Sequence, residues 1–383
     1  MKRTKFYSGL IALVLMLSFS LLLPLKSNDV IYAQTSELTT AKAMMVLEAS
    51  SLRPLYFHNE SEKLPMASTT KIITAIFVIE NNEDLDKVIE IPKEAVGIEG
   101  TSIGLKEGEH LTIRELLYGL MLRSGNDSAV ALAIATCGSV ENFVVEVNKY
   151  LKERGLKDTS LANPHGLDHK DHYTTASDLA KITAYALNNE TFSEIVGTKQ
   201  KLISNEKKTK TSRNLINKNK LLKNYEYADG VKTGFTKKAG RCFVGSATKD
   251  GMRLVCVLLN CNPMFEECEY LLNKGFNEYK MHSLLKKDDL LSCIKIEGAN
   301  QDKLQVRARA SFMYPLKESE LHNIKMKVSC PKSLSAPIKE GELLGEVEIN
   351  LENQLIFSDK IYSILGVKPN TFEYYFNRIV EQM

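Results

Sequence analysis

Hydrophobic and polar residues follow strand-like and helix-like patterns in turn over residues 43–280. Short apolar runs predict strands at residues 43–49, 54–58, 87–91, 241–247 and 252–259. Apolar positions three and four apart predict helices at residues 69–81, 112–122, 128–137, 140–155, 175–187 and 266–280. Thr112 and Glu115 form a capping-box pattern, and Lys249-Asp250-Gly251 is a hairpin-turn signal. Because strands bracket a block of helices, the pattern predicts an α+β fold in which helices cover a sheet.

The pattern changes near the C-terminus. Residues 290–356 alternate between polar and apolar side chains and are punctuated by Pro331, Pro337 and Gly341, which predicts a small β-domain. Residues 371–383 form an amphipathic helical pattern, whose apolar face holds Phe372, Tyr375, Phe376, Ile379 and Val380. Such a helix can lie on a membrane surface or pack on its own domain. The lysine-rich polar face of many membrane-surface helices is missing, and both interpretations stay open.

The N-terminus has the pattern of a secretory signal peptide. Three of the first five residues are basic, an apolar run covers residues 9–25, and Ala33 supplies a small residue for cleavage. An uncleaved membrane anchor is the alternative, although Pro24 and Lys26 interrupt the run. We therefore expect an exported protein that acts outside the cytoplasm, on the cell-wall side of the membrane.

Charge and cysteine content exclude some classes of protein. The chain of 383 residues has a net charge of +3, and removal of residues 1–33 takes away a net +3. A nearly neutral mature chain argues against a nucleic-acid partner. The seven cysteines are widely spread without a C-x-x-C pair, so neither a zinc site nor a redox motif is indicated. We expect free thiols, with a Cys256–Cys268 or Cys261–Cys268 bridge as the open alternative.

Candidate chemistry begins at Ser68 and Lys71, at the start of the helix expected over residues 69–81. Residues three apart share a helical face, so the lysine amine can reach the serine hydroxyl. A buried lysine with a lowered pKa can take the serine proton and turn a weak nucleophile into a strong one. On its own the pair is also compatible with a capped amphipathic helix.

Two further motifs follow in order, Ser124-Gly125-Asn126 in a loop between helices and Lys232-Thr233-Gly234 at the start of a strand. With Ser68-x-x-Lys71 they make up the three-motif set of penicillin-binding proteins and β-lactamases. The chain therefore resembles the serine D,D-carboxypeptidases of the low-molecular-mass penicillin-binding protein family, and among them most resembles the sporulation-type members of Gram-positive bacteria. The resemblance extends to residues 123–127, 163–168 and 229–236 and to the β-domain.

The resemblance implies a role for each motif residue. Ser68 would be the nucleophile, Lys71 its general base, and Ser124 a proton relay toward the leaving nitrogen. The substrate would be a peptidoglycan stem peptide ending in D-Ala-D-Ala, and penicillin would acylate the same serine. Substrate contacts are expected from Asn126, Lys232, Thr233 and Gly234 and from the backbone N–H of Phe235, which would share the oxyanion hole with that of Ser68. No cofactor or metal is implied.

The resemblance also implies the domain organisation. We expect a signal peptide at residues 1–33 and a penicillin-binding catalytic domain at residues 34–283, with an antiparallel sheet flanked by helices. A β-sandwich-like domain is expected at residues 284–358, followed by a C-terminal segment at residues 359–383.

One departure and three alternatives qualify this interpretation. Relatives often carry an arginine just after the second hairpin strand to hold the substrate carboxylate, and residues 260–266 contain none, so Arg241 or another basic group would substitute.

A β-lactamase would need a carboxylate poised to activate water, and none is placed convincingly. A non-catalytic penicillin sensor would usually carry a transmembrane signalling module. The histidines His165, His169 and His172 suggest a metal, but they lack a ligand pattern of known geometry.

Overall fold

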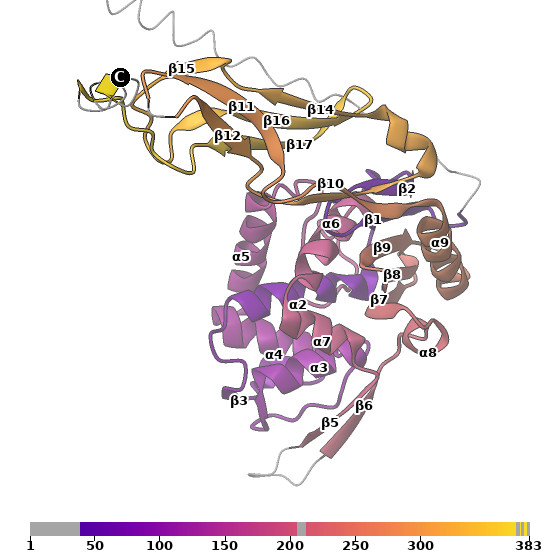
Figure 1. The fold of residues 1–383 in the computed structure, drawn as a ribbon. Helices are drawn as coiled ribbons and strands as arrows, with labels where there is room; N and C mark the ends of the chain where they lie inside the picture. Colours follow the sequence, from indigo (N-terminus) through magenta and orange to yellow (C-terminus); the bar gives the residue numbers. More distant parts are fainter. Residues whose placement is uncertain (1–38, 205–211, 300, 373–375, 377–378, 381–383) are drawn as a thin grey trace, which may run out of the picture.

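The computed structural model describes residues 39–204, 212–299, 301–372, 376 and 379–380. Its centre is a five-stranded antiparallel sheet with the strand order β2-β1-β9-β8-β7 (Figure 1). The strands are β1 (Ala43–Glu48), β2 (Pro54–His58), β7 (Ala228–Thr236), β8 (Gly240–Lys249) and β9 (Met252–Leu259). Strand β1 pairs with β9, which brings the beginning of the described chain beside a strand about 200 residues later. The predicted α+β fold with an antiparallel sheet is confirmed.

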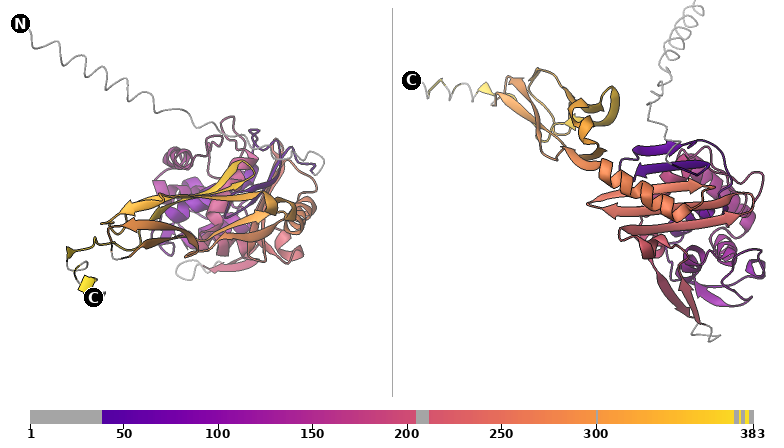
Figure 2. Two further views of the ribbon diagram at one scale, coloured as in Figure 1. Left: turned by 45° about the horizontal axis from the view of Figure 1, so that its top comes forward. Right: turned by 90° about the vertical axis from the view of Figure 1, so that its right-hand side faces the viewer.

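Alternating side chains of the sheet enter two separate hydrophobic cores. On β9, Val255 and Val257 belong to one core, whereas Leu254, Cys256 and Leu258 belong to the other. This is the two-residue period of a strand that is buried on both faces. The helices of the first core are α2 (Lys71–Glu80), α3 (Ile113–Leu122), α4 (Asn126–Cys137), α5 (Val140–Glu153), α6 (Ala176–Leu187) and α7 (Glu190–Gly197). The opposite face is covered by α8 (Leu221–Asn224) and α9 (Met264–Glu278), and Figure 2 shows α9 lying across the sheet.

Helix α2 lies inside the helical layer, and every residue from Lys71 to Ile79 is buried. The sequence predicts its start near Thr69, but the chain first makes a 3₁₀ turn, η2 (Ala67–Thr70), before the α-helix begins. Two hydroxyls shape this turn: Thr69 Oγ1 donates to Met66 O at 2.6 Å and Thr70 Oγ1 donates to Ala67 O at 2.7 Å. Such side-chain bonds satisfy carbonyls outside the regular helix ladder.

Several elements differ from the sequence expectation or are new. The strand expected at residues 87–91 is short, β3 (Val88–Glu90), and pairs with β4 (His110–Thr112). A further 3₁₀ turn, η3, spans Lys93–Ala95. The polar region after α7 forms a hairpin of β5 (Gln200–Ser204) and β6 (Ser212–Ile216), which Figure 1 shows projecting from the body. Because this hairpin buries few side chains, its sequence shows no regular alternation of apolar and polar residues that would predict the strands.

The C-terminal part is a separate β-domain with its own hydrophobic core. Its strands are β10 (Lys280–Leu285), β11 (Leu290–Glu297), β12 (Lys303–Arg307), β13 (Phe312–Leu316), β14 (Ile324–Ser329), β15 (Ser333–Ser335), β16 (Leu343–Leu351) and β17 (Gln354–Tyr362), with the 3₁₀ turn η4 (Glu318–Asn323). They form the sheets β12-β11-β15, β14-β16-β17 and β10-β13. The alternating pattern of residues 290–356 therefore predicts this β-domain correctly.

The β-domain contacts the sheet domain through the arginine that precedes β2. Arg53 is almost fully buried, donates to Pro315 O and forms an ion pair with Glu320 at 2.5 Å. Its guanidinium lies 5.3 Å and 5.1 Å from the ring centres of Tyr279 and Tyr314. Figure 1 shows the β-domain against this end of the molecule, beside β2 and α9.

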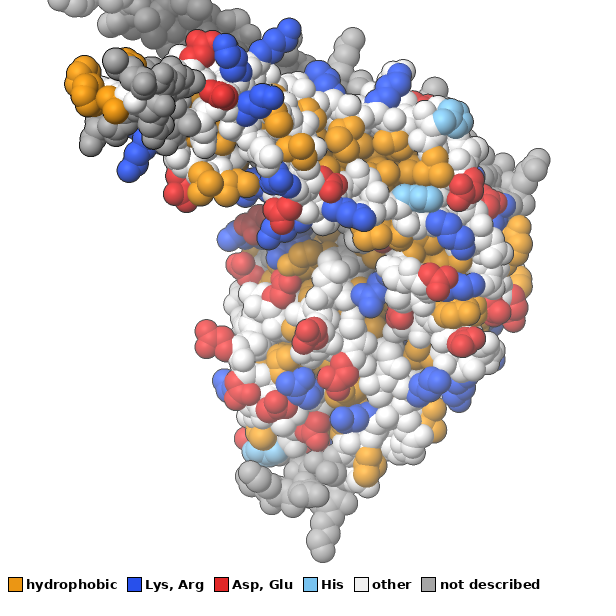
Figure 3. All heavy atoms as spheres, in the orientation of Figure 1, with side chains coloured by type: hydrophobic (Ala, Val, Ile, Leu, Met, Phe, Trp, Pro, Cys, Tyr) orange, Lys and Arg blue, Asp and Glu red, His pale blue; other side chains and the backbone are white. Residues whose placement is uncertain are grey.

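All seven cysteines lie in described residues and are free thiols. No single described helix is long and apolar enough to span a bilayer; α4 and α5 reach that length only together, across a bend of 80°. On the face shown in Figure 3, acidic and basic side chains are interspersed.

Candidate active site

The structure brings Ser68 and Lys71 together as the sequence predicts. Lys71 is the first residue of α2, and its Nζ lies 2.9 Å from Oγ of Ser68 in turn η2. Ala67, directly before the serine, adopts a positive φ of 48°, which is uncommon for a residue other than glycine. The serine thus sits on a sharp turn at the entrance of a buried helix.

The surroundings of Lys71 suit a neutral amine. Its Nζ contacts Asn126 Oδ1 at 2.7 Å and His165 O at 2.5 Å besides the serine hydroxyl. The two carbonyl oxygens can only accept; when the amine is neutral they take its two N–H bonds, which leaves the lone pair for the serine proton. Burial lowers the pKa of Lys71 well below its usual value, the charges of Lys232 and Lys218 add to that effect, and Asp127 opposes it.

The second motif lies where α3 passes into α4. Asn126 is the first residue of α4 and is fixed by two loop carbonyls, because its backbone N–H donates to Thr101 O and its Nδ2 to Glu99 O, both at 2.6 Å. Ser124 has a positive φ of 65° and is 4% exposed. Its Oγ has no hydrogen-bond partner among the described residues, including Lys71 and Lys232.

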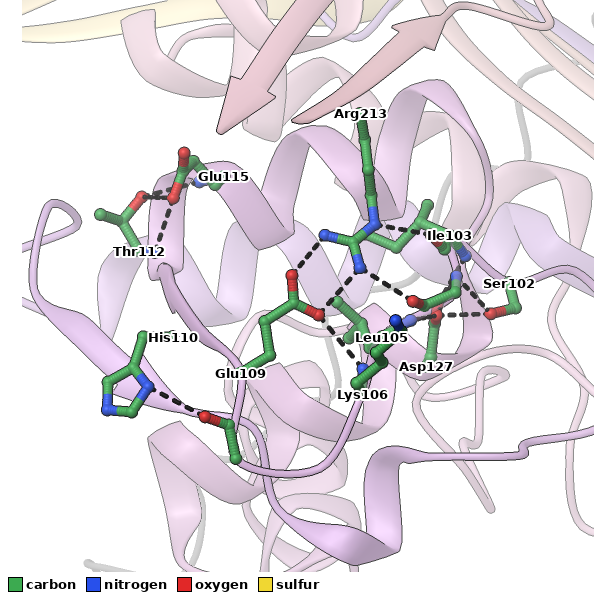
Figure 4. A network of polar contacts seen from close by, with 12 residues as sticks. Ser102, Ile103, Leu105, Lys106, Glu109, His110, Thr112, Glu115, Asp127 and Arg213 are labelled. Atoms are coloured by element: carbon green, nitrogen blue, oxygen red, sulfur yellow. Dashed lines mark hydrogen bonds and ion pairs between the residues drawn. The ribbon is translucent and has the colours of Figure 1, made fainter. Parts of the chain in front are cut away.

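A network of charges supports the loop that holds Asn126 (Figure 4). The Asp127 carboxylate accepts from Ser102 Oγ at 2.5 Å and from the backbone N–H groups of Ile103 and Leu105. Arg213 of the β5–β6 hairpin donates to Ile103 O at 2.9 Å and pairs with the buried Glu109. Arg213 is absent from the predicted site, since an arginine in a basic stretch has no local signal of burial.

The third motif lies on β7, at the edge of the central sheet. Lys232 is buried and its Nζ donates to Thr233 O at 2.9 Å. Burial, reinforced by the charge of Lys218, lowers the pKa of Lys232 to about 7. A Cβ at Gly234 would lie 3.0 Å from Ser68 N, so glycine allows β7 to run directly beside the nucleophile turn. The Phe235 side chain is exposed.

The loop at residues 162–173 closes the other side of the turn. A Cβ at Gly166 would lie 2.0 Å from Ala67 O, and the next residue upstream, His165, supplies the carbonyl that Lys71 contacts. Burial lowers the pKa of His165 to about 3 and that of His172 to about 4, with smaller effects from nearby charges. Among the described residues no three histidine, cysteine, aspartate or glutamate side chains form a metal-binding group.

Sequence reasoning misses one cation of the site. Lys218 follows the β5–β6 hairpin, and its backbone N–H donates to Leu122 O at the end of α3. Its charge lowers the pKa of both Lys71 and Lys232. It lies in a stretch rich in lysine, where nothing in the sequence distinguishes it from its neighbours.

Comparison with known proteins agrees with this geometry. Residues 30–262 match the peptidase S11 family, described as D-alanyl-D-alanine carboxypeptidase, and residues 279–368 match the C-terminal domain of penicillin-binding protein 5. D-alanyl-D-alanine carboxypeptidase DacF of Bacillus subtilis is 31% identical over 351 residues, which cover 88% of this chain and 89% of DacF.

Solved structures agree as well. Penicillin-binding protein 5 from Haemophilus influenzae has a TM-score of 0.73 at 26% identity, covering 88% of this chain and 99% of that one. The Streptomyces K15 DD-transpeptidase has a TM-score of 0.60 at 30% identity, covering 64% of this chain and 100% of that one. The resemblance drawn from the three motifs is confirmed: the chain belongs to the peptidase S11 family of D-alanyl-D-alanine carboxypeptidases.

Proposed function

We propose that this chain is a serine D,D-carboxypeptidase that removes the terminal D-alanine from peptidoglycan stem peptides. The observation that supports it most is the buried amine of Lys71, 2.9 Å from Ser68 Oγ and bonded to two carbonyl oxygens. A lysine held in this way is a base for the serine and needs no histidine. Family membership supplies the substrate class.

Acylation starts at the carbonyl of the penultimate D-alanine. Ser68 Oγ attacks that carbonyl while its proton passes to Lys71 Nζ. The oxyanion that forms is held by the backbone N–H groups of Ser68 and Phe235. The close approach of Gly234 to Ser68 N supports this pairing, because it brings β7 beside the turn.

Departure of D-alanine needs a proton on its nitrogen. The buried Ser124 Oγ, which has no partner among the described residues, is free to pass the proton of Lys71 to that nitrogen. Lys232 supplies positive potential beside it, and the Thr233 hydroxyl binds the terminal carboxylate. Asn126 holds the peptide amide, and the stem peptide pairs with the free edge of β7.

The acyl-enzyme is then hydrolysed. Water attacks the Ser68 ester and releases the shortened stem peptide, so the serine is ready for another cycle. Penicillin presents a similar carbonyl and carboxylate, acylates Ser68 and stays attached. The chain therefore acts in the synthesis and remodelling of the cell wall.

One experiment separates this function from its alternatives. Purified protein is incubated with a diacetyl-Lys-D-Ala-D-Ala peptide and with labelled penicillin. Release of D-alanine and a long-lived penicillin adduct, both lost in Ser68→Ala, support the proposal. Rapid turnover of penicillin favours a β-lactamase, and an adduct without peptide turnover favours a sensor. Transfer of the acyl group to an added amine instead of water favours a transpeptidase.

We further propose export and contact with a membrane surface. The predicted signal peptide, residues 1–33, lies outside the described residues. In the C-terminal segment, the described residues Phe372, Phe376, Ile379 and Val380 are helical and more than half of each side chain is exposed. An apolar helical face left in water favours a lipid surface over packing.

This membrane contact has its own test. The mature chain should sediment with phospholipid vesicles, and replacement of Phe372 and Phe376 by serine should leave it in the supernatant. Equal sedimentation of both proteins would refute the proposal. We also propose the division into domains at residues 34–283, 284–358 and 359–383; strand β10 (Lys280–Leu285) crosses the first of these limits and strand β17 (Gln354–Tyr362) crosses the second.

A further inference from the structure

A chain of hydrogen bonds leads from a buried histidine to the turn that carries the nucleophile. The His172 ring nitrogen Nε2 lies 2.7 Å from Thr70 Oγ1, and Thr70 Oγ1 lies 2.7 Å from Ala67 O. The other ring nitrogen, Nδ1, accepts from the Ala162 backbone N–H at 3.0 Å. His172 is 3% exposed and Thr70 is fully buried, so these groups exchange no bonds with solvent.

Only one arrangement of protons satisfies this chain. Nδ1 faces an N–H and must therefore accept, which places the proton of the neutral ring on Nε2. Nε2 then donates to Thr70 Oγ1, and the hydroxyl donates onward to Ala67 O. Burial lowers the pKa of His172 to about 4, so the ring keeps this neutral form at neutral pH.

The carbonyl at the end of this series of hydrogen bonds belongs to the Ala67–Ser68 peptide, which also carries the Ser68 N–H. Ala67 C=O and Ser68 N–H are the two ends of one planar peptide group, so holding the oxygen fixes the direction of the N–H. That carbonyl is also confined by Gly166, where a Cβ would lie 2.0 Å away. On the other side, Ser68 N faces β7, where a Cβ at Gly234 would lie 3.0 Å from it.

We propose that Thr70 and His172 are positioning residues for the oxyanion hole, acting through the Ala67–Ser68 peptide. The inference rests on the proposed function, in which the Ser68 N–H binds the oxyanion. The strained φ of 48° at Ala67 means that this peptide needs support from outside the helix ladder. A hydrogen bond to its oxygen also polarises the peptide and strengthens the N–H as a donor.

The test uses two pairs of matched variants. Thr70→Val removes the hydroxyl at nearly constant volume, whereas Thr70→Ser keeps it. His172→Phe removes the ring N–H, whereas His172→Gln places an amide nitrogen near the position of Nε2. Thermal melting shows which variants are folded. Each pair of variants is an independent test of the hydrogen bonds from His172 through Thr70 to Ala67 O.

The readouts are kcat and KM for D-alanine release and the affinity for a peptide boronic acid, whose adduct with Ser68 places an oxygen in the oxyanion hole. Loss of an oxyanion donor lowers kcat by about 100-fold or more, so loss of its support should lower kcat about tenfold. We expect this for Thr70→Val and His172→Phe, with equally weakened boronate binding, KM within about twofold and an unchanged acid limb of the pH profile. Thr70→Ser and His172→Gln should stay near the wild type.

The double variant Thr70→Val/His172→Phe should be no worse than the poorer single variant, because both residues act through one chain. Wild-type kcat in both single variants, or losses that multiply in the double variant, would overturn the inference. If the wild-type protein neither releases D-alanine nor forms a penicillin adduct, it is the proposed function that fails.

Discussion

Three lysines share the electrostatics of the active site at the residue scale. Lys71 and Lys232 are both buried, and desolvation is the largest cause of the lowered pKa of each. The charge of Lys218 lowers both values further. Because a base must be neutral to accept a proton, each effect would widen the pH range in which Lys71 acts as the proposed base for Ser68.

Removing the charge of Lys218 should narrow that range. In Lys218→Met the pKa of Lys71 rises, so at a given pH on the acid side a smaller fraction of the amine is neutral. We expect the acid limb of penicillin acylation to move to higher pH, measured as the second-order rate of adduct formation. Lys218→Arg keeps the charge and serves as the control. Identical pH profiles for the Met and Arg variants would contradict this prediction.

The cation that binds the substrate carboxylate is a second residue-scale question. Arg241 lies opposite Phe235 in the β7–β8 pairing, with its guanidinium 5.9 Å from the phenylalanine ring centre. If Arg241 replaces the missing arginine, Arg241→Ala should raise KM for a D-Ala-D-Ala peptide at least several-fold. Arg241→Lys, which keeps the charge, should change KM less. Unchanged kinetics in Arg241→Ala would assign the carboxylate to another basic group.

At the scale of elements, the site depends on how closely β7 approaches the nucleophile turn. The nearest atoms to a Cβ at Gly234 are Ser68 N at 3.0 Å and Thr69 N at 3.1 Å, both in the backbone. Backbone atoms cannot rotate away as a flexible side chain can, so β7 and η2 would have to separate. The proposed mechanism requires both elements, since each would supply one N–H to the oxyanion.

Gly234→Ala should therefore damage catalysis more than folding. We expect kcat/KM to fall at least about tenfold, because small displacements of reacting groups are costly. The control is Gly366→Ala in the C-terminal segment, where the nearest atom to a Cβ is Ile338 O at 3.4 Å. Equal kcat/KM for the two variants would show that the strand can shift without loss.

At the scale of the whole molecule, the contact between the two domains and the candidate active site lie at opposite edges of the central sheet. Arg53 precedes β2, whereas Lys232-Thr233-Gly234 lies on β7 at the opposite edge. The arginine is buried between two tyrosine rings and pairs with Glu320, and Lys317 pairs with Glu278 at 2.9 Å beside it. This contact couples the domains without touching the catalytic groups.

Breaking this contact should separate stability from activity. In Arg53→Met, Glu320 and Pro315 O lose their bonds to the arginine, although Glu320 keeps its bond from the Lys317 backbone N–H, and the contact between the domains is weakened. We expect calorimetry to show the two domains of Arg53→Met unfolding in separate transitions, which lie closer together in the wild type. The value of kcat/KM for D-alanine release should stay within about twofold of the wild-type value. Glu320→Gln keeps a hydrogen-bond acceptor and should lie between. An unchanged calorimetric trace for Arg53→Met would mean that the interface does not couple the domains.

Much of this protein follows from local sequence. The Ser68–Lys71 contact needs only their spacing, the Thr112–Glu115 capping box forms as predicted, and the alternating residues 290–356 become strands. These features depend on residues that are close together in the sequence, so the sequence predicts them. The three motifs likewise identify the family.

Only the tertiary structure decides the electrostatics and the support of the site. The carbonyl of His165, the charge of Lys218 and the His172–Thr70 chain come from segments about 90 to 150 residues away from Ser68 and Lys71. The sequence does not show which of many lysines and histidines is buried, because burial depends on packing between distant segments. Desolvation by that packing lowers the pKa of Lys71, as the proposed role of general base requires, and no local pattern encodes it.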